Sequence, residues 1–426
     1  MVNLWHKLFL EDRPSIGLSF FRVAVAVTVG FHVIPTLIPL DDVYLHTAFK
    51  VLNFNFFTPG ALALVQQSPD ALVVFFVALF CLSWFCFLIG LFSQASCVVM
   101  TLCCYYFYAL NSFVIGKLSW DILLVTLFLM CVTPYHGDYF SIDCLRRGDP
   151  MAYRRQRPFF LQRLLQMQLA FTFFYTGLYK ITAIGNWFTD NPIYYLMKYP
   201  DAGVTKYFLI RDFMAAHPGL CYVMGVVIVV TELAMPFLLF CPATRVSAIY
   251  LGFIFHVTLI LTLDVPAIFF FLFPAQFLLF IHPGSIVEAI ERRRRFYGQA
   301  PPVLMVYDGK CQFCVASVQP LKVMDLFHRI RWVDYQQYEN VKVLHPQLTA
   351  EIARSQLHMI DWDGTMYGGF FAFRRLAFLL PMLYPLIPFL YFPGSGIAGP
   401  FVYRWIAKNR YLLHFNKRCT DNACFR

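Results

Sequence analysis

Charged residues are scarce in this chain, and their scarcity excludes a soluble globular protein. Only 14% of the 426 residues are Asp, Glu, Lys or Arg, whereas 59% are hydrophobic. A typical soluble domain has about 25% charged residues. The composition instead predicts a polytopic membrane protein with a soluble appendage. The 48 Phe and 24 Tyr residues supply lipid-facing bulk and anchors at the membrane interface.

The cysteines lack the pattern of a disulfide framework. Nine of the 13 precede residue 245, and most lie in apolar stretches, where they behave as small hydrophobic residues. A cleavable signal peptide is also missing, because the first apolar run, residues 15–40, is too long for a signal h-region. We therefore expect this run to stay in the protein as its first membrane segment.

Eight apolar segments each offer roughly the 20 residues that a helix needs to cross the hydrocarbon. An even number of spans puts both termini on one side of the membrane. The segments are residues 15–40, 71–92, 93–114, 118–135, 159–181, 219–241, 245–263 and 267–281.

The basic residues behind the net charge of +10 cluster beside the apolar segments. They therefore indicate orientation in the membrane and not nucleic-acid binding. With the N-terminus inside, twelve basic residues fall in inward segments and five in outward loops, which fits the positive-inside rule. This orientation puts both termini in the cytosol and the basic run at residues 291–295 at the cytoplasmic headgroups. The inward set is Lys7, Arg13, Arg146, Arg147, Arg154, Arg155, Arg157, Arg245 and Arg292 to Arg295, and the outward set is Lys50, Lys117, Lys198, Lys206 and Arg211.

A Cys-x-x-Cys motif stands in the soluble part, within Asp308-Gly-Lys-Cys311-Gln-Phe-Cys314. It follows a short apolar run, residues 303–307, and precedes an amphipathic run, residues 315–327. This order predicts a strand, a tight turn at Gly309 and a helix that begins at the first cysteine.

The motif favours redox chemistry. A thiol at a helix N-terminus is stabilised as thiolate and so as a nucleophile, and a thiol three residues later can resolve a mixed disulfide. We assign attack to Cys311 and resolution to Cys314, and we expect Cys314 to be the less exposed of the two. The alternatives are unreactive thiols and half of a zinc site. A zinc ribbon needs a second such pair, but the only later cysteines, Cys419 and Cys424, have four residues between them.

The tail has the pattern of a small α/β domain. A hairpin turn is predicted at Asp363–Gly364, and the prolines between residues 381 and 393 break a stretch that we expect to lie against the bilayer. We place a helical membrane domain at residues 1–290, a basic linker at 291–301 and the α/β domain at 302–426. Strands are predicted at 303–307, 330–335, 357–361 and 365–367, and further helices at 345–355, 370–380 and 399–413.

Five separated motifs occur in order in the tail: Asp308-Gly-x-Cys-x-x-Cys314, Gly364-x-x-Tyr-x-Gly368, Ala372-Phe-Arg-Arg-Leu376, Leu380-Pro381 and Tyr403-Arg-Trp-Ile-Ala-x-Asn-Arg410. Together they resemble the DCC family of thiol-disulfide oxidoreductases, over about the last 125 residues. The resemblance implies a thioredoxin-like fold around a CxxC redox centre. Lys310 and Gln312 depart mildly from the family, where an acidic residue and proline are common.

The membrane part carries Phe174-Tyr-Thr-Gly-Leu-Tyr-Lys180 with Trp187 beyond, Ser141-Ile-Asp143, Glu232 before Pro236, and His256. These residues resemble the HTTM family, the membrane module related to vitamin K-dependent gamma-carboxylase, over residues 10–285. The resemblance implies that Lys180 is a base that deprotonates a reduced quinone. Fusion of the two modules in this order recurs in bacteria, which implies a bacterial inner membrane.

Ionisable residues inside spans are functional candidates because their burial is costly. Lys180, near the outward end of its segment, is either a desolvated base or a side chain that snorkels to the headgroups. Glu232, near mid-depth, is either catalytic, paired with another ionisable group, or protonated. His256 is either catalytic or a hydrogen-bond partner between helices. We expect Lys180, Asp121 and His256 to share one outward cavity.

Three further residues complete the membrane set. Arg22 is expected to be structural, and His32 a hydrogen-bond partner between helices. Asn111 is the nearest counterpart of the carboxylase's helper histidine. Because the carboxylase's large extracytoplasmic domain is missing as well, we do not expect glutamate carboxylation.

The sequence thus predicts an integral membrane thiol-disulfide oxidoreductase whose helical bundle holds a quinone-like or lipid-like molecule. The alternatives are a redox-sensing transporter or lipid-handling protein and a non-catalytic maturation factor. Expected partners are the lipid bilayer, a quinone or lipid and a protein dithiol, with no metal and no nucleic acid. Cys419 and Cys424 either form a secondary dithiol that exchanges with Cys311 and Cys314 or are two solvent-exposed thiols.

Overall fold

The computed structural model shows two compact units. The first holds residues 1–143 and 154–286, and the second holds residues 144–153 and 287–426. Cys419 and Cys424 lie outside the described residues, which are 5–45, 65–111, 118–182, 186–199, 210–299, 301–392 and 394–409.

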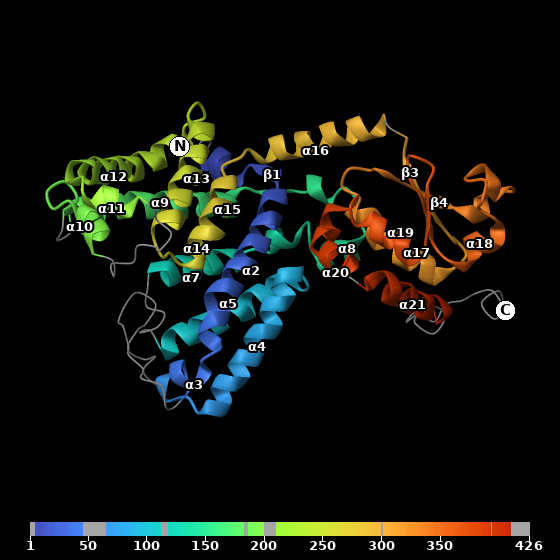
Figure 1. Ribbon diagram of the computed structural model, residues 1–426, viewed down its shortest axis with the longest axis horizontal. Helices are drawn as coiled ribbons and strands as arrows, with labels where there is room; N and C mark the ends of the chain where they lie inside the picture. The colour runs from blue at the N-terminus through green and yellow to red at the C-terminus, as the bar shows by residue number, and fades with distance from the viewer. Residues whose placement is uncertain are drawn as a thin grey trace. The chain divides into compact units, whose positions relative to one another are not determined.

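The first unit is helical (Figure 1). A two-stranded antiparallel sheet pairs β1 (Asp12–Pro14) with β2 (Gln156–Pro158). The helices are α2 (Ile16–Leu37), α3 (Leu40–Val43), α4 (Asp70–Ile89), α5 (Ser93–Leu110), α7 (Leu118–Met130), α9 (Phe160–Thr182), α10 (Pro192–Lys198), α11 (Arg211–Ala215), α12 (Pro218–Phe240), α13 (Arg245–Thr262), α14 (Ala267–Phe270) and α15 (Leu272–Leu278); α8 (Ile142–Arg147) and α16 (Pro283–Gly298) cross the division between the units.

Helices occupy all eight segments predicted to span the membrane, but the count of eight spans is not confirmed. Within the described residues, five helices (α2, α4, α5, α12 and α13) are long and apolar enough to cross. A sixth span is added if Ile268–Leu278, which comprises most of α14 and α15, and α16 count as one span bent by 85°. The stretch that includes α7 is too short, and α9 has four polar residues among its first nine. Gln162 and Gln166 of α9 both donate to the carbonyl of Leu279, at 2.6 and 2.7 Å.

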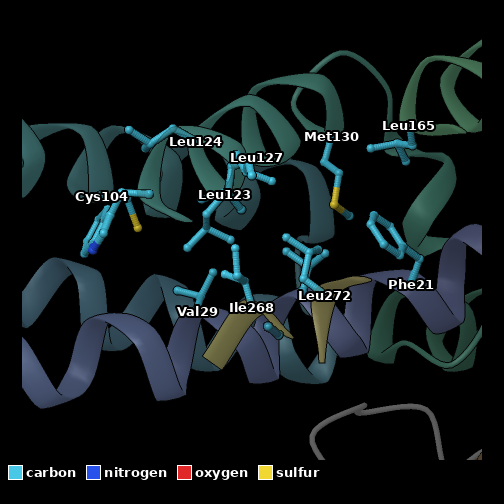
Figure 2. Close-up of a cluster of buried hydrophobic side chains, with 14 of the residues drawn as sticks. Phe21, Val29, Cys104, Leu123, Leu124, Leu127, Met130, Leu165, Ile268 and Leu272 are labelled. Carbon is cyan, nitrogen blue, oxygen red and sulfur yellow. The ribbon is translucent and has the colours of Figure 1, made fainter. Parts of the chain in front are cut away.

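Packing between the helices forms a large hydrophobic core in the first unit. A smaller separate cluster joins α10, α11 and α12. Figure 1 shows α4 and α5 side by side. Helix α4 also packs on α2, and α5 also packs on α7, so all four helices contribute to the same large core. Figure 2 shows side chains of α7, among them Leu123 and Leu127, meeting Val29 of α2 and Leu272 of α15. Cys104 is buried in this core too, as expected of a cysteine that serves as a small hydrophobic residue.

Arg22 is structural, as predicted. Its guanidinium is fully buried and donates to the carbonyls of Phe87, Leu88 and Phe140, which ties α2 to the end of α4. The Ser-Ile-Asp motif has a related role, because Asp143 accepts the backbone N–H groups of Phe92 and Ser93 at 2.9 and 2.7 Å and so caps the start of α5.

The second unit contains a four-stranded mixed sheet in the order β4-β3-β5-β6. Strand β3 (Val303–Tyr307) is parallel to β4 (Ile330–Asp334) and antiparallel to β5 (His358–Ile360), which pairs antiparallel with β6 (Met366–Gly368). The turn between β5 and β6 contains Gly364 with φ +83°, as the predicted hairpin requires. The predicted fold class, a helical membrane domain followed by a small α/β domain, is confirmed.

Successive residues of each strand point to opposite sides of this sheet. Helices pack on both faces and cover them. Val303 and Met305 join one cluster with Leu321 of α17 (Gln312–Met324) and Leu376 of α19 (Phe370–Leu376). On the other face, Val306 belongs to a second cluster of side chains, to which α18 (Ala350–Ser355) contributes. After α19 the chain continues into η7 (Pro381–Leu386), α20 (Ile387–Leu390) and α21 (Ser395–Lys408).

One prediction about the second unit is corrected. The helix predicted at residues 345–355 is only six residues long, because Thr349 caps its start by accepting the N–H of Ile352. The basic run at residues 291–295 lies in α16. Arg294 is buried, donates to the Tyr153 hydroxyl and places its guanidinium 5.0 Å from the ring centre. This contact explains why residues 144–153 group with the second unit.

Candidate functional site

The Cys-x-x-Cys motif joins β3 to α17, as the sequence predicts. Cys311 is the N-cap residue of α17, and its Sγ accepts the backbone N–H of Cys314 at 3.4 Å. A sulfur at this position meets the unpaired N–H groups and the positive end of the helix dipole, which both favour thiolate over thiol. The motif therefore has the local geometry that dithiol chemistry requires.

The loop before the cysteines is fixed by two carboxylates. Asp308 accepts the N–H of Lys310 at 3.0 Å, and Asp334, at the end of β4, accepts the N–H of Gly309 at 2.9 Å. A Cβ added to Gly309 would lie 2.0 Å from a carboxylate oxygen of Asp334. Glycine is therefore required at this position by close approach and not only by the turn.

We expect Gly309→Ala to move this loop and to destabilise the second unit. Overpacking of this kind typically costs about 1–3 kcal/mol, which differential scanning fluorimetry of the full chain in lipid nanodiscs would detect as a lower melting temperature. Gly298→Ala is the matched control, since a Cβ there meets no atom within 4 Å. Equal melting temperatures for the two variants would contradict the close approach of Asp334.

Cys314 lines a cavity whose described lining does not include Cys311. This cavity of about 690 Å³ lies within the second unit. Cys311 is only 8% exposed, whereas Cys314 is half-buried. The expected order of exposure is therefore wrong. Cys311 is the more buried of the two because its side chain folds over the first turn of α17, where its Sγ accepts the N–H of Cys314.

In the first unit, Lys180 and Glu232 form an ion pair. Nζ of Lys180 donates to both carboxylate oxygens, at 2.8 and 2.7 Å, and the two side chains are 18% and 7% exposed. Nζ also lies 5.1 Å from the centre of the Trp187 ring, within reach of a cation–π interaction. Glu232 is therefore paired with another ionisable side chain, which is one of the alternatives that the sequence left open.

The absence of a side chain at Gly177 allows the Lys180–Glu232 ion pair to form. A Cβ at Gly177 would lie 3.0 Å from Leu233 and 3.1 Å from the Cβ of Glu232. The missing side chain lets α9 and α12 approach closely, as small residues do between membrane helices. Lys180 stands three residues later on the same face of α9, so its side chain reaches Glu232.

His256 offers a hydrogen-bond acceptor to the same region. Its Nδ1 lies 2.9 Å from the carbonyl oxygen of Gly252, and because a carbonyl only accepts, Nδ1 carries the hydrogen. In the neutral ring, Nε2 is then an acceptor, and within the described residues no hydrogen bond reaches it. The imidazole is 3% exposed and lies among the rings of Phe173, Phe255, Phe269, Phe273 and Phe277.

Lys180, Glu232 and His256 line one cavity of about 290 Å³ within the first unit. Most of its other lining residues are apolar or aromatic, and the hydroxyls of the four threonines in the lining donate to backbone carbonyls of their own helices. The ion pair and the imidazole are therefore its ionisable features. An aromatic or short apolar molecule with a hydroxyl or carbonyl group would fit these features. Proton transfer and hydrogen bonding are the chemistry that the three side chains can supply.

The other candidates in the membrane part lie elsewhere. Asp121 does not line this cavity with Lys180 and His256, so the expected grouping is wrong; its carboxylate accepts the Tyr108 hydroxyl at 2.7 Å instead. His32 packs against Trp120, with ring centres 5.2 Å apart. The amide of Asn111 donates to a backbone carbonyl at 2.7 Å and is fully buried.

Two family models match the chain. One is described as an HTTM domain and matches residues 12–284; the other is described as a DCC1-like thiol-disulfide oxidoreductase and matches residues 305–416. The chain belongs to the HTTM domain family. Both resemblances drawn from the motifs are confirmed, and together they make the chain a multi-pass membrane protein with a redox domain of the DCC1-like family. No curated protein and no solved structure matches the chain.

The remaining motifs of the DCC1-like domain hold the fold around the cysteines. Arg375 of α19 donates to Asp361 at 2.7 Å, directly after β5. The Tyr403 hydroxyl accepts the N–H of Leu357 at 3.2 Å, which attaches α21 to the start of β5. These contacts make the two motifs positioning elements of the domain.

Asp334 is the residue of the redox loop that sequence reasoning missed. It lies at the end of a predicted strand beside the one that leads to the motif. Because the carboxyl ends of parallel strands meet at one edge of a sheet, that position was the available signal. Nothing in the sequence separates Asp334 from the other acidic residues without the strand pairing.

Proposed function

We propose that this HTTM-family protein is a membrane-bound thiol-disulfide oxidoreductase in which Cys311 and Cys314 cycle between dithiol and disulfide. The observation that carries the proposal is the sulfur of Cys311 at the N-cap of α17, at 3.4 Å from the N–H of Cys314. This arrangement puts both thiols on one turn and stabilises one of them as thiolate. The match to the DCC1-like thiol-disulfide oxidoreductase model supports it.

The exposure of the two residues favours an assignment of roles opposite to the first expectation. Cys314 lines the cavity and meets the substrate, with which it forms the mixed disulfide or thiol adduct. Cys311 then attacks Sγ of Cys314, the Cys311–Cys314 bond forms, and the substrate leaves with both electrons. Two thiols lose two protons and two electrons in the cycle, so the acceptor must take both.

The helical domain is proposed to hold a lipophilic partner of quinone-like chemistry. The cavity at Lys180 fits the polar end of such a molecule, since His256 can accept from a hydroxyl and the Lys180–Glu232 pair can donate to an oxygen. A quinone supplies two-electron redox chemistry that matches a dithiol. Lys180 and Glu232 can hold or move a proton between Nζ and a carboxylate oxygen, which lie 2.7 Å apart.

A stoichiometric assay tests the proposal. The reduced full-length protein in lipid nanodiscs is mixed with a short-chain quinone, and the thiols are then trapped by alkylation and mapped by mass spectrometry. We expect one Cys311–Cys314 disulfide for each quinol formed, and no disulfide without quinone. Thiols that stay reduced against an excess of quinone would overturn the quinone partner. Vectorial lipid flux without thiol oxidation would instead support the lipid-handling alternative.

We further propose a bacterial inner-membrane location, which the fusion of the two modules supports, with both termini and Cys311 in the cytosol, which the charge distribution supports. An impermeant maleimide added to intact cells should then miss Cys311 and Cys314 and reach them after lysis. Peptide mass spectrometry identifies the labelled cysteine in each case. Efficient labelling before lysis would reverse the orientation and move the redox domain to the periplasmic side.

A further inference from the structure

The cavity beside Cys314 is apolar along most of its wall. It is lined by Leu321 of α17, Phe373 of α19, Leu390 of α20, and Val402 and Ile406 of α21. Within the described lining, Asp308 and Arg354 are the charged residues. Burial also lowers the pKa of the nearby His358, so that ring adds no charge at neutral pH. Such a lining attracts apolar groups and offers little to water.

The volume of this cavity is that of a ligand site. About 690 Å³ falls within the roughly 300–1,000 Å³ that is typical of sites for small molecules. It is more than a single side chain of a substrate protein needs. One thiol, that of Cys314, stands in its wall.

The helices that form its outer wall carry an exposed apolar face. Ile397 is 84% exposed, Phe401 70% and Trp405 57%, and Phe389, which also lines the cavity, is 74% exposed. Contiguous exposure of this kind is rare on soluble surfaces and marks interaction sites. Large apolar residues with a tryptophan and basic residues, here Arg404 and Lys408 of α21, are typical of helices that lie in a membrane interface.

We propose that this cavity binds the apolar chain of a membrane-borne amphiphile, with Cys314 as the thiol that meets the bound molecule. The bilayer supplies the ligand, because the same chain crosses the membrane. The exposed face of α20 and α21 lies in the interface, so the chain of the amphiphile reaches the cavity from lipid. The chemical consequence, a redox reaction of the head group at Cys314, rests on the proposed function; binding of the apolar chain does not.

Chain-length-dependent alkylation tests the proposal in full-length protein in lipid nanodiscs. The probes are N-ethylmaleimide and N-octylmaleimide, whose double bond adds the thiolate sulfur on one carbon and a proton on the other. Each buried methylene adds roughly fourfold in affinity, so we expect the octyl probe to alkylate Cys314 at least about tenfold faster than the ethyl probe. The rates are normalised to Cys241, an exposed cysteine that lines none of the cavities described above.

A matched pair of variants separates the cavity from the bilayer. Val402→Trp fills the cavity and should abolish the octyl advantage at Cys314, while Ile397→Trp changes the exposed face of the same helix and should keep it. An equal chain-length effect at Cys314 and Cys241, or an unchanged advantage in Val402→Trp, overturns the proposal. Neither result depends on redox turnover, so failure here is distinguishable from failure of the dithiol chemistry.

Discussion

Replacing Cys314 or Cys311 by serine is expected to abolish dithiol oxidation by a quinone. A single thiol cannot close the Cys311–Cys314 disulfide, so turnover should fall to the background rate in either variant. The two variants should differ in what they trap. Cys311→Ser keeps the thiol that lines the cavity and should accumulate an adduct on Cys314, whereas Cys314→Ser should accumulate none.

Intact-mass measurement after incubation with a small disulfide reports the adduct directly. Serine is close to cysteine in size, so both variants should melt within a few degrees of the unaltered protein. An adduct that forms on Cys311 in Cys314→Ser, and not on Cys314 in Cys311→Ser, would restore the opposite assignment of roles. Undiminished turnover in both variants would remove the motif from the reaction.

Lys180→Met is expected to have the largest effect in the helical domain. It leaves the carboxylate of Glu232, 7% exposed, without its 2.7 Å partner, and loss of one member of a buried pair typically costs about 3–5 kcal/mol. A clear drop in melting temperature is therefore expected, together with loss of quinone-dependent thiol oxidation. Lys180→Arg keeps a cation for Glu232 but cannot give up a proton.

The arginine variant decides whether Lys180 has a chemical role. If it moves a proton, Lys180→Arg should retain the melting temperature and lose about 100-fold or more in the rate of quinone-dependent oxidation. The exchanged pair, Lys180→Glu with Glu232→Lys, is the matched control, since it keeps one charge of each sign. Full activity in the arginine variant would leave an ion pair that only stabilises the bundle.

The sequence was sufficient for the redox motif because its signals are local. An apolar run, Gly309 and two cysteines three residues apart specify strand, turn and helix N-terminus without reference to distant residues. The relative exposure of Cys311 and Cys314 could not be predicted from these local signals. It depends on a side-chain cap and on a cavity whose lining includes residues of η7, α20 and α21, far along the chain.

In the helical domain, hydropathy located the helices but did not determine how many are long and apolar enough to cross. Polar residues at the start of α9 and the bend between α15 and α16 are packing features, and they account for part of the difference from eight spans. Lys180, Glu232 and His256 could each be singled out because burial of such groups is costly. Their grouping could not, because it depends on the close approach of α9 and α12 at Gly177.

Equilibrium titration of the Cys311–Cys314 couple tests the central claim most directly. The full-length protein in nanodiscs is equilibrated in buffers of defined thiol–disulfide potential, trapped by alkylation and quantified by peptide mass spectrometry. A catalytic couple should show one two-electron transition, between about −120 and −270 mV, the range of dithiol oxidoreductases. Two cysteines that stay reduced throughout, or a disulfide that resists reduction below about −300 mV as structural bridges do, would contradict it.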